Sequence, residues 1–188
     1  MASGVRSDAL RNRERLLEVA VRLFAERGSD VSPAMVAKEA GVGVGTLYRH
    51  FPTRNALVEA AYRADLHRLC ESAPGLIAEH GGAGALRVWL GRCVDHAITK
   101  RGMADALRTV VTSDRDPSAD SRDLLTAAVA ELLAAGAADG TLREDLDPYD
   151  VLVGVTGVSL ATGEYGDRKQ ANRLLDLMMD SYRRSAAR

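Results

Sequence analysis

The chain has 188 residues and is poor in the residue types that strands and disulfide frameworks need. Aromatic residues make up 4% of it, and 2 isoleucines stand against 30 alanines and 23 leucines. Alanine and leucine favour helices, whereas strands favour β-branched and aromatic side chains, so this balance predicts an all-α protein. No stretch approaches the roughly 18 uninterrupted apolar residues of a membrane span. Residues 1–15 lack the apolar region of a secretory signal.

Cysteine is scarce as well. The two cysteines, Cys70 and Cys93, are too few for a metal cluster or a disulfide framework. Free thiols are typical of a reducing compartment. We therefore expect a soluble cytoplasmic protein with no metal, no cofactor and no membrane partner, and 46% apolar residues provide ample material for a core.

Charge is nearly balanced overall but unevenly distributed. The formal net charge is −1, yet the first 64 residues hold ten lysines and arginines against seven acidic residues. The remainder holds fifteen against nineteen. A basic N-terminal segment indicates that this part meets a polyanion, although chance variation between segments is an open alternative at this point.

The N-terminal segment carries the pattern of three helices. Apolar residues recur at helical spacing before Gly28, at Leu16, Ala20, Leu23 and Phe24. Ser32-Pro33 then provides a capping side chain and a first-turn proline for a short helix that ends at Gly41. A second short helix over 43–51 ends before Pro52, with Leu47 and Phe51 on its inner face.

The outer face of this second short helix is polar, aromatic and basic. Thr46, Tyr48, Arg49 and His50 have no core role that their spacing explains. Two short helices joined by a glycine turn, with such a face on the second, predict a helix-turn-helix whose second helix enters the DNA major groove. Hydroxyl and cationic groups then hold phosphates, and the most protruding side chains read base edges.

These motifs resemble the DNA-binding domain of TetR-family transcriptional regulators. The stretches RLLEVAVRLFAERG (15–28), VAKEAGV (36–42) and GTLYRHF (45–51) carry the resemblance over about fifty residues. It implies an all-α fold, with a three-helix helix-turn-helix domain over 9–53 and a helical ligand-binding and dimerisation domain over 54–188. It further implies a homodimer on a palindromic double-stranded DNA operator, most simply a repressor that a small-molecule effector releases.

The resemblance also implies the DNA contacts. Thr46, Tyr48 and His50 match positions that hold the phosphate backbone, with Thr46 also reaching a base edge. Val44, Gly45 and Arg49 match positions that face bases, although Val44 has the alternative of packing beside Leu47. The remaining matches are phosphate contacts by Arg54 at the start of the next helix and, less strongly, by Lys38. Two departures from the family pattern are Gly43 in place of a capping serine and Ala34 in place of a long base-contacting side chain.

A long helix from residue 54 to about 73 should follow, ended by Pro74-Gly75. In the family this helix links the DNA-binding domain to the ligand-binding domain. By analogy, an effector that tilts it would spoil the spacing of roughly 34–36 Å that two recognition helices need to enter successive major grooves.

The C-terminal domain carries a helical stripe formed by Trp89, Arg92 and His96. This stripe predicts an amphipathic pocket for an acidic effector. The alternative is a core Trp89 beside solvated or structurally satisfied polar residues. Met103 and Leu107, on the next short helix, complete the expected ligand-binding set. Residues 89–107 and 140–148 look like the C-terminal domain of the SbtR-like branch of the family, which names no ligand.

The last two helices predict the dimer interface. Asp147-Pro148 reads as a cap and first-turn proline, and Gly154 and Gly157 imply close backbone approach by another element. The final helix presents an apolar face of Ala171, Leu174, Leu175, Met178 and Tyr182. One chain of this size can hardly cover both helices, so residues of about 148–184 should meet their symmetry copies. Burial of both faces within one chain is the alternative.

An enzyme is the main rival class, and the sequence disfavours it. There is no glycine-rich phosphate loop, metal-ligand spacing or nucleophile elbow. The side chains of Asp95 and His96, adjacent on a helix, point apart, and Cys93 lies on an apolar seam. Two regulators of the same fold are further alternatives: one that senses oxidation through Cys70 or Cys93, and one that activates. The sequence leaves the effector, the operator and the regulated genes open, and also whether two dimers share one operator.

Overall fold

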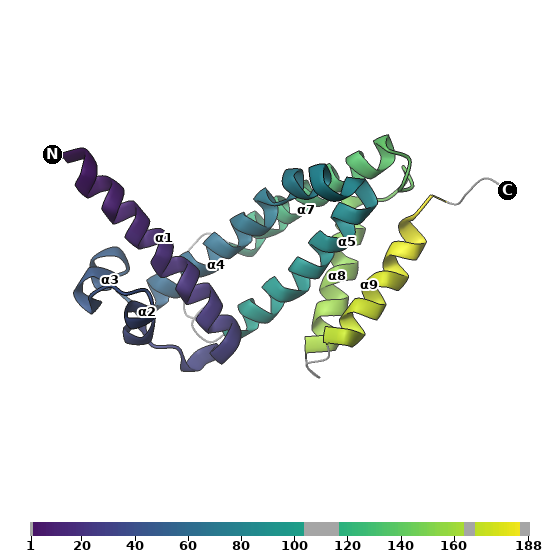
Figure 1. Cartoon of the computed structure of the whole chain (residues 1–188). Helices are drawn as coiled ribbons and strands as arrows, with labels where there is room; N and C mark the ends of the chain where they lie inside the picture. Colours follow the sequence, from purple (N-terminus) through teal and green to yellow (C-terminus); the bar gives the residue numbers. More distant parts are fainter. Residues whose placement is uncertain (1, 104–116, 164–167, 185–188) are drawn as a thin grey trace. The chain divides into compact units, whose positions relative to one another are not determined.

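The computed structural model describes residues 2–103, 117–163 and 168–184 (Figure 1). Within these ranges the chain forms eight α-helices and one short 3₁₀ turn, and it has no strand beyond an isolated bridge between Leu142 and Arg183. The predicted all-α fold is confirmed. No helix in the described ranges is long and apolar enough to cross a membrane.

The chain divides into two compact units. The first runs to Asp65 and takes in the chain from Thr99, of which 99–103 are described; the second covers Leu66–Ile98 and the chain from Asp116. Two helices, α4 (Arg54–Glu71) and α5 (Ala73–Gly102), therefore contribute to both units. The first unit extends beyond the expected division at residue 53, because the first turns of α4 are buried in the same core as the helices before them.

The first unit begins with α1 (Ala2–Arg27), the 3₁₀ turn η1 (Gly28–Asp30), α2 (Pro33–Glu39) and α3 (Val44–His50). Its boundaries follow the sequence signals. Gly28 and Gly41 adopt positive φ of 58° and 67°, and the Ser32 hydroxyl accepts a hydrogen bond from the Met35 N–H at 3.3 Å.

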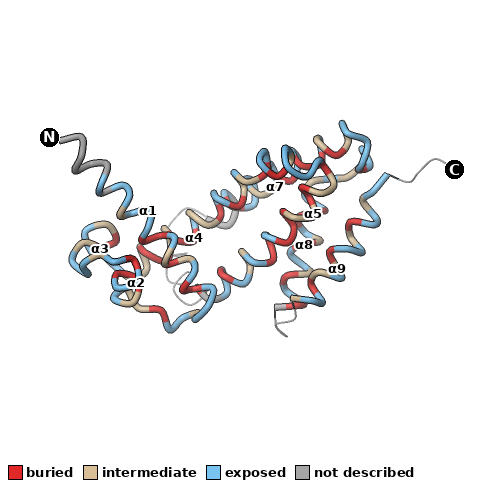
Figure 2. The backbone as a smooth tube through the Cα atoms, viewed as in Figure 1, coloured by how far each residue is buried: buried red, intermediate tan, exposed pale blue. Residues whose placement is uncertain are grey.

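The core of the first unit lies between these helices (red in Figure 2). Leu47 is fully buried and Phe51 is 2% exposed, so the expected inner face of α3 is confirmed. Because α2 and α3 each span 7 residues, they depend on this packing rather than on helix propensity. The other large members of the core are Leu16, Leu17, Leu23, Phe24, Val31, Val36, Leu57, Val58, Tyr62 and Met103.

The second unit contains the end of α4, most of α5, α7 (Pro117–Ala138), α8 (Pro148–Gly163) and α9 (Arg168–Tyr182). Helix α8 packs on α7, and α9 lies alongside α8 (Figure 1). The Asp147 carboxylate accepts hydrogen bonds from the N–H groups of Tyr149 and Asp150, which confirms the expected cap of α8.

Helix α5 differs from the expectation. Pro74-Gly75 does not end a helix; Pro74 lies in the first turn of α5, where its missing N–H is tolerated. The interruption lies instead at Gly81, whose φ is 68° and ψ 177°. After this kink the helix restarts with unpaired N–H donors, and these need partners from elsewhere in the chain.

Two side chains from the segment after α7 supply those partners. The Gly82 N–H donates to the Asp139 carboxylate at 2.7 Å, and the Ala83 N–H donates to the Thr141 hydroxyl at 3.2 Å. The two helices also meet without side chains, because a Cβ on Gly82 would fall within 3.0 Å of backbone atoms of Gly136. Residues distant in sequence therefore cap and pack the second half of α5.

Candidate nucleic-acid interface

The outer face of α3 is open to solvent. Val44 is 42% and Tyr48 46% exposed, Gly45 and Arg49 are exposed, and Thr46 and His50 are half-buried. Lys38 is exposed on α2. Leu47 is fully buried, whereas Val44 is exposed, so Val44 is not packed in the core beside Leu47. This favours the outward role of Val44.

The inner face holds α3 in place. Its N-terminus at Gly43 has no side-chain cap, as the sequence indicated, and the Thr46 N–H donates instead to the Gly43 carbonyl at 2.9 Å. Its last turn closes where the Phe51 N–H donates to the Leu47 carbonyl at 2.8 Å. A Cβ on Gly45 would have nothing within 4 Å. The protomer therefore leaves the backbone at Gly45 accessible to a partner surface.

Arginines on α1 support this arrangement. The Arg13 guanidinium lies 5.4 Å from the centroid of the Phe51 ring, which is a cation–π contact at the end of α3. Arg22 pairs with Glu39 of α2 at 3.0 Å and with Glu26 at 3.7 Å. The side chains of both pairs are about half exposed, so neither pair adds much stability.

Arg54 is engaged with the protein backbone. Its Nη2 donates to the Ser29 carbonyl at 2.9 Å and its Nε to the Val31 carbonyl at 3.4 Å, while the guanidinium lies 6.0 Å from the Phe24 ring centroid. Sequence reasoning missed these contacts, because the accepting carbonyls are 25 and 23 residues away and leave no local signal.

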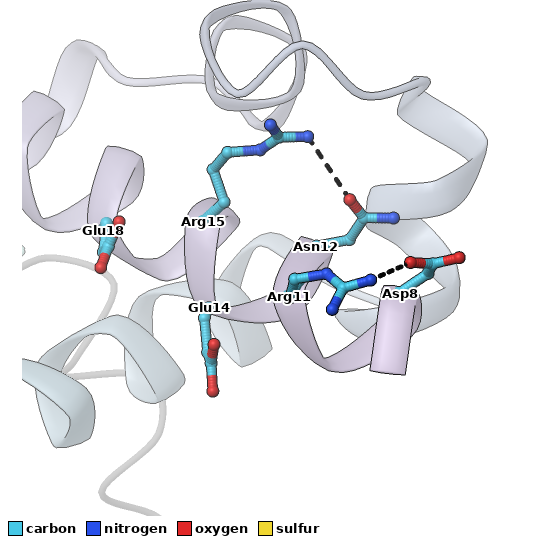
Figure 3. Close-up of a pocket in the computed structure, with 6 residues that line it drawn as sticks. All are labelled: Asp8, Arg11, Asn12, Glu14, Arg15 and Glu18. Atoms are coloured by element: carbon cyan, nitrogen blue, oxygen red, sulfur yellow. Dashed lines mark hydrogen bonds and ion pairs between the residues drawn. The ribbon is translucent and has the colours of Figure 1, made fainter. Parts of the chain in front are cut away.

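A shallow hollow of about 560 Å³ lies along α1, and Figure 3 shows the residues that line it. Arg15 donates to Asn12 at 3.4 Å there, and Arg11 pairs with Asp8. All of the lining residues belong to one helix and are charged or polar. Ligand pockets are concave and mostly apolar, so this hollow is an open helix surface.

The three residues of the expected effector stripe do not share one environment. Trp89 is fully buried, and its indole N–H donates to the Leu69 carbonyl at 3.0 Å. Arg92, by contrast, is exposed and His96 half-buried. Of the two interpretations considered for this stripe, the core role of Trp89 is the one that the structure supports.

Of the other two expected effector residues, Met103 is described and Leu107 is not. Met103 is 1% exposed and belongs to the core of the first unit, beside the helix-turn-helix. Leu107 lies outside the described residues. The physical reason for the difference at Met103 is that the chain returns to the first unit at Thr99, so Met103, directly after α5, packs in a different core from Trp89.

The two thiols sit in the core of the second unit or against it. Burial raises the pKa of Cys70 to about 11 and raises that of Cys93 well above its usual range. The thiolate is the reactive form, so both thiols are protonated and slow to oxidise at neutral pH. This disfavours the redox-sensing alternative. In the described part of the chain, no group of three histidine, cysteine or acidic residues is placed to hold a metal ion.

Two family models match the chain. Residues 16–61 match the bacterial regulatory proteins of the tetR family, and residues 82–183 match the C-terminal domain of SbtR-like transcriptional regulators. An HTH-type transcriptional regulator of Staphylococcus aureus is 44% identical over 64 residues, which are 34% of this chain and 35% of that protein. This chain thus matches about a third of the length of such curated relatives.

Solved structures extend the likeness to more than nine-tenths of the chain. A TetR transcriptional regulator of Streptomyces coelicolor is 50% identical, with a TM-score of 0.85 over 93% of this chain and 99% of that chain. A TetR transcription regulatory protein of Mycobacterium vanbaalenii is 33% identical, with a TM-score of 0.77 over 96% of this chain and 99% of that one. With both family models matched and a 50% identical regulator covering 93% of this chain, the chain belongs to the TetR family of DNA-binding transcriptional regulators, with an SbtR-like C-terminal domain, and is not an enzyme.

Proposed function

We propose that this regulator binds a palindromic operator as a homodimer, represses transcription there, and leaves the DNA when a small molecule binds its second unit. The observation that carries the proposal is the division of α3. Leu47 and Phe51 are buried, while an aromatic, a cationic and a backbone-exposing residue face solvent on the opposite side. A helix held in this way fits a major groove.

The exposed residues take distinct roles in this proposal. Tyr48, Thr46 and His50 hold phosphates through their hydroxyl and imidazole groups, and Lys38 adds a charge from α2. Arg49 reads base edges, since its planar fork matches the acceptors of guanine. Val44 meets a thymine methyl, and Gly45 allows the backbone to approach the groove.

The dimer interface is proposed on α8 and α9. Val153 and Leu160 lie on one face of α8 and are 53% and 66% exposed, and Leu177 on α9 is 67% exposed. Gly157 lies between the two α8 residues, and a Cβ there would have nothing within 4 Å in the protomer. Gly154 is different, because Met178 approaches it within the same chain. The exposed strip on α8 therefore leaves room for a partner helix to approach closely.

The effector step relies on α4 and α5. Helix α4 supplies core residues to both units, and α5 leads directly into Met103 of the first core, so a ligand that shifts these helices in the second unit changes the first unit through continuous backbone. The chemistry of the effector follows from neither unit. The genes next to the operator would limit the chemical classes to which the effector can belong.

The experiment is selection of genomic DNA fragments by the purified protein, followed by sequencing. We expect enriched fragments to share a palindrome whose half-sites are about one helical turn, or a multiple of it, apart. If no duplex is retained even at low ionic strength, the proposal is wrong. The same selection then tests the individual roles.

Two variants separate phosphate contact from base reading. Tyr48→Ala should weaken binding to every fragment by a similar factor and keep the ranking of the fragments. Arg49→Ala should reorder the fragments, because a lost base contact costs about 1–3 kcal/mol at one base pair. Arg122→Ala, an exposed arginine on α7 of the second unit, is the matched control and should change neither readout. If the ranking of fragments is unchanged for Arg49→Ala, Arg49 does not read base edges.

A further inference from the structure

Arg54 begins α4, directly after the residue that caps this helix. The Ala56 N–H donates to the Thr53 hydroxyl at 3.0 Å, so the cap is complete without Arg54. A cation in the first turn faces the positive end of the helix dipole, which is an unfavourable position. The Arg54 side chain reaches instead to carbonyl oxygens, whose negative ends offset that repulsion.

Those carbonyls belong to Ser29 and Val31, which lie just before α2. The segment between Val31 and Arg54 contains α2, the turn and α3, that is, the whole helix-turn-helix. Arg54 thus connects the entry of this segment to its exit. Ser29 is exposed, but Val31 is 2% exposed and Phe24, whose ring centroid lies 6.0 Å from the guanidinium, is 1% exposed, so two of the three contacts are with core residues.

We propose that Arg54 positions the recognition helix by joining the two ends of the helix-turn-helix, and does not act as a phosphate contact. The Nε–H and one Nη2–H are used by the two carbonyls, so these bonds, and not a phosphate, set the direction of the side chain. Without this connection, α3 retains its side chains but loses a constraint on its position relative to α1.

The residue type supports the inference. Arginine presents several N–H donors in one plane and stacks that plane on an aromatic ring, whereas lysine is a single point charge. The contacts with two carbonyls and a phenylalanine ring therefore depend on the planar group with several donors that arginine has and lysine lacks. A phosphate contact would need the positive charge, which either residue supplies.

The first test needs no DNA. Amide hydrogen exchange of α3 is compared between the full-length wild type, Arg54→Lys and Arg54→Gln. We expect both variants to exchange severalfold faster at the Phe51 and Leu47 amides, with no change in α8. Arg63→Gln removes the same charge from an exposed ion pair on α4 and should match the wild type. Unchanged exchange in the Arg54 variants would overturn the inference.

The second test rests on the proposed function and uses the duplex that the wild type enriches from a random-sequence pool. At a temperature where every variant is folded, Arg54→Lys and Arg54→Gln should both lose about tenfold in affinity, the range of a hydrogen bond from a charged group. The slope of log affinity against log salt should stay at the wild-type value, because no phosphate contact is lost.

Each alternative gives a different result. If lysine keeps full affinity and glutamine lowers the salt slope by about one unit, Arg54 contacts a phosphate and the inference is wrong. If both variants melt earlier but bind DNA as the wild type does, Arg54 stabilises the unit without positioning α3, which also overturns it. A wild type that enriches no duplex contradicts the proposed function, and hydrogen exchange still decides the role of Arg54.

Discussion

At the scale of single residues, the exposed carboxylate of Asp139 has a structural role that the local sequence does not predict. Asp139 accepts hydrogen bonds from the Thr141 hydroxyl at 2.5 Å, from the Gly82 N–H at 2.7 Å and from the Thr141 N–H at 3.0 Å. These bonds favour the charged form and lower the pKa of Asp139, the Thr141 hydroxyl being the largest contributor. The carboxylate therefore stabilises the kink of α5 more when it is ionised than when it is protonated.

The sign of the pH dependence follows. A group whose pKa is lower in the folded state contributes stability above its unfolded pKa of about 3.9, and that contribution is lost as pH falls through the folded pKa. We expect Asp139→Asn to lower the free energy of unfolding by about 1 kcal/mol at pH 7, the net value of one hydrogen bond, because both carboxylate oxygens accept and the amide keeps only one acceptor. The difference from wild type should shrink below about pH 4.

Urea unfolding at pH 7 and pH 3 measures this difference. Asp123→Asn removes the same charge from an exposed site on α7 and should show little effect at either pH. A deficit for Asp139→Asn that is equally large at pH 3 would mean that the charge of Asp139 does not matter.

At the scale of elements, the sequence predicted the short helices better than the long ones. The bounds of α2 and α3 depend on local signals, such as Ser32-Pro33, Gly41 and Pro52, each of which acts on its own neighbours. The kink of α5 depends on Asp139 and Thr141, about sixty residues away, so no local pattern places it.

The same distinction separates the candidate sites. The outer face of α3 follows from spacing within seven residues, and its exposure agrees with the sequence. The roles of Arg54, Trp89 and Met103 depend on which backbone or core lies opposite them. Helical spacing gives the face of a helix but not the element that covers it, so Met103 was assigned to an effector site and is found in the first unit's core.

The crossing of α5 and α7 gives a prediction at this scale. Gly82→Ala would place a Cβ within 3.0 Å of the Gly136 backbone, and backbone cannot move aside as a flexible side chain can. We expect a loss of at least about 2 kcal/mol in the free energy of unfolding, in the range of overpacked cores.

The matched control lies in the same helix. A Cβ on Gly75 meets nothing within 4 Å, and its φ is not positive. Gly75→Ala should therefore stabilise the protein by about 0.5–1 kcal/mol, because alanine is the better helix former. Thermal or urea unfolding of both variants checks the pair. If Gly82→Ala unfolds like Gly75→Ala, the two helices do not cross as closely as described.

At the scale of the whole molecule, the uncovered apolar strip on α8 is the feature that needs a partner. Scattered exposed leucines are common, but Val153 and Leu160 flank a glycine with open space above it, on a helix whose other face is buried. A second copy of the same helix would cover this strip symmetrically, since each copy supplies both the knobs and the gap between them.

Leu160→Glu tests this interface directly. Two glutamates brought together in a desolvated interface repel each other, so the variant should be a folded monomer at concentrations where the wild type is a dimer by sedimentation velocity. Leu124→Glu changes another exposed leucine, on α7, and should leave the dimer intact. The monomer should also lose most of its affinity for a palindromic duplex, because one recognition helix then contacts one half-site at a time and the gain from linkage disappears. A dimer that survives Leu160→Glu would place the contact between copies elsewhere, and a wild type that sediments as a monomer would contradict the proposed homodimer.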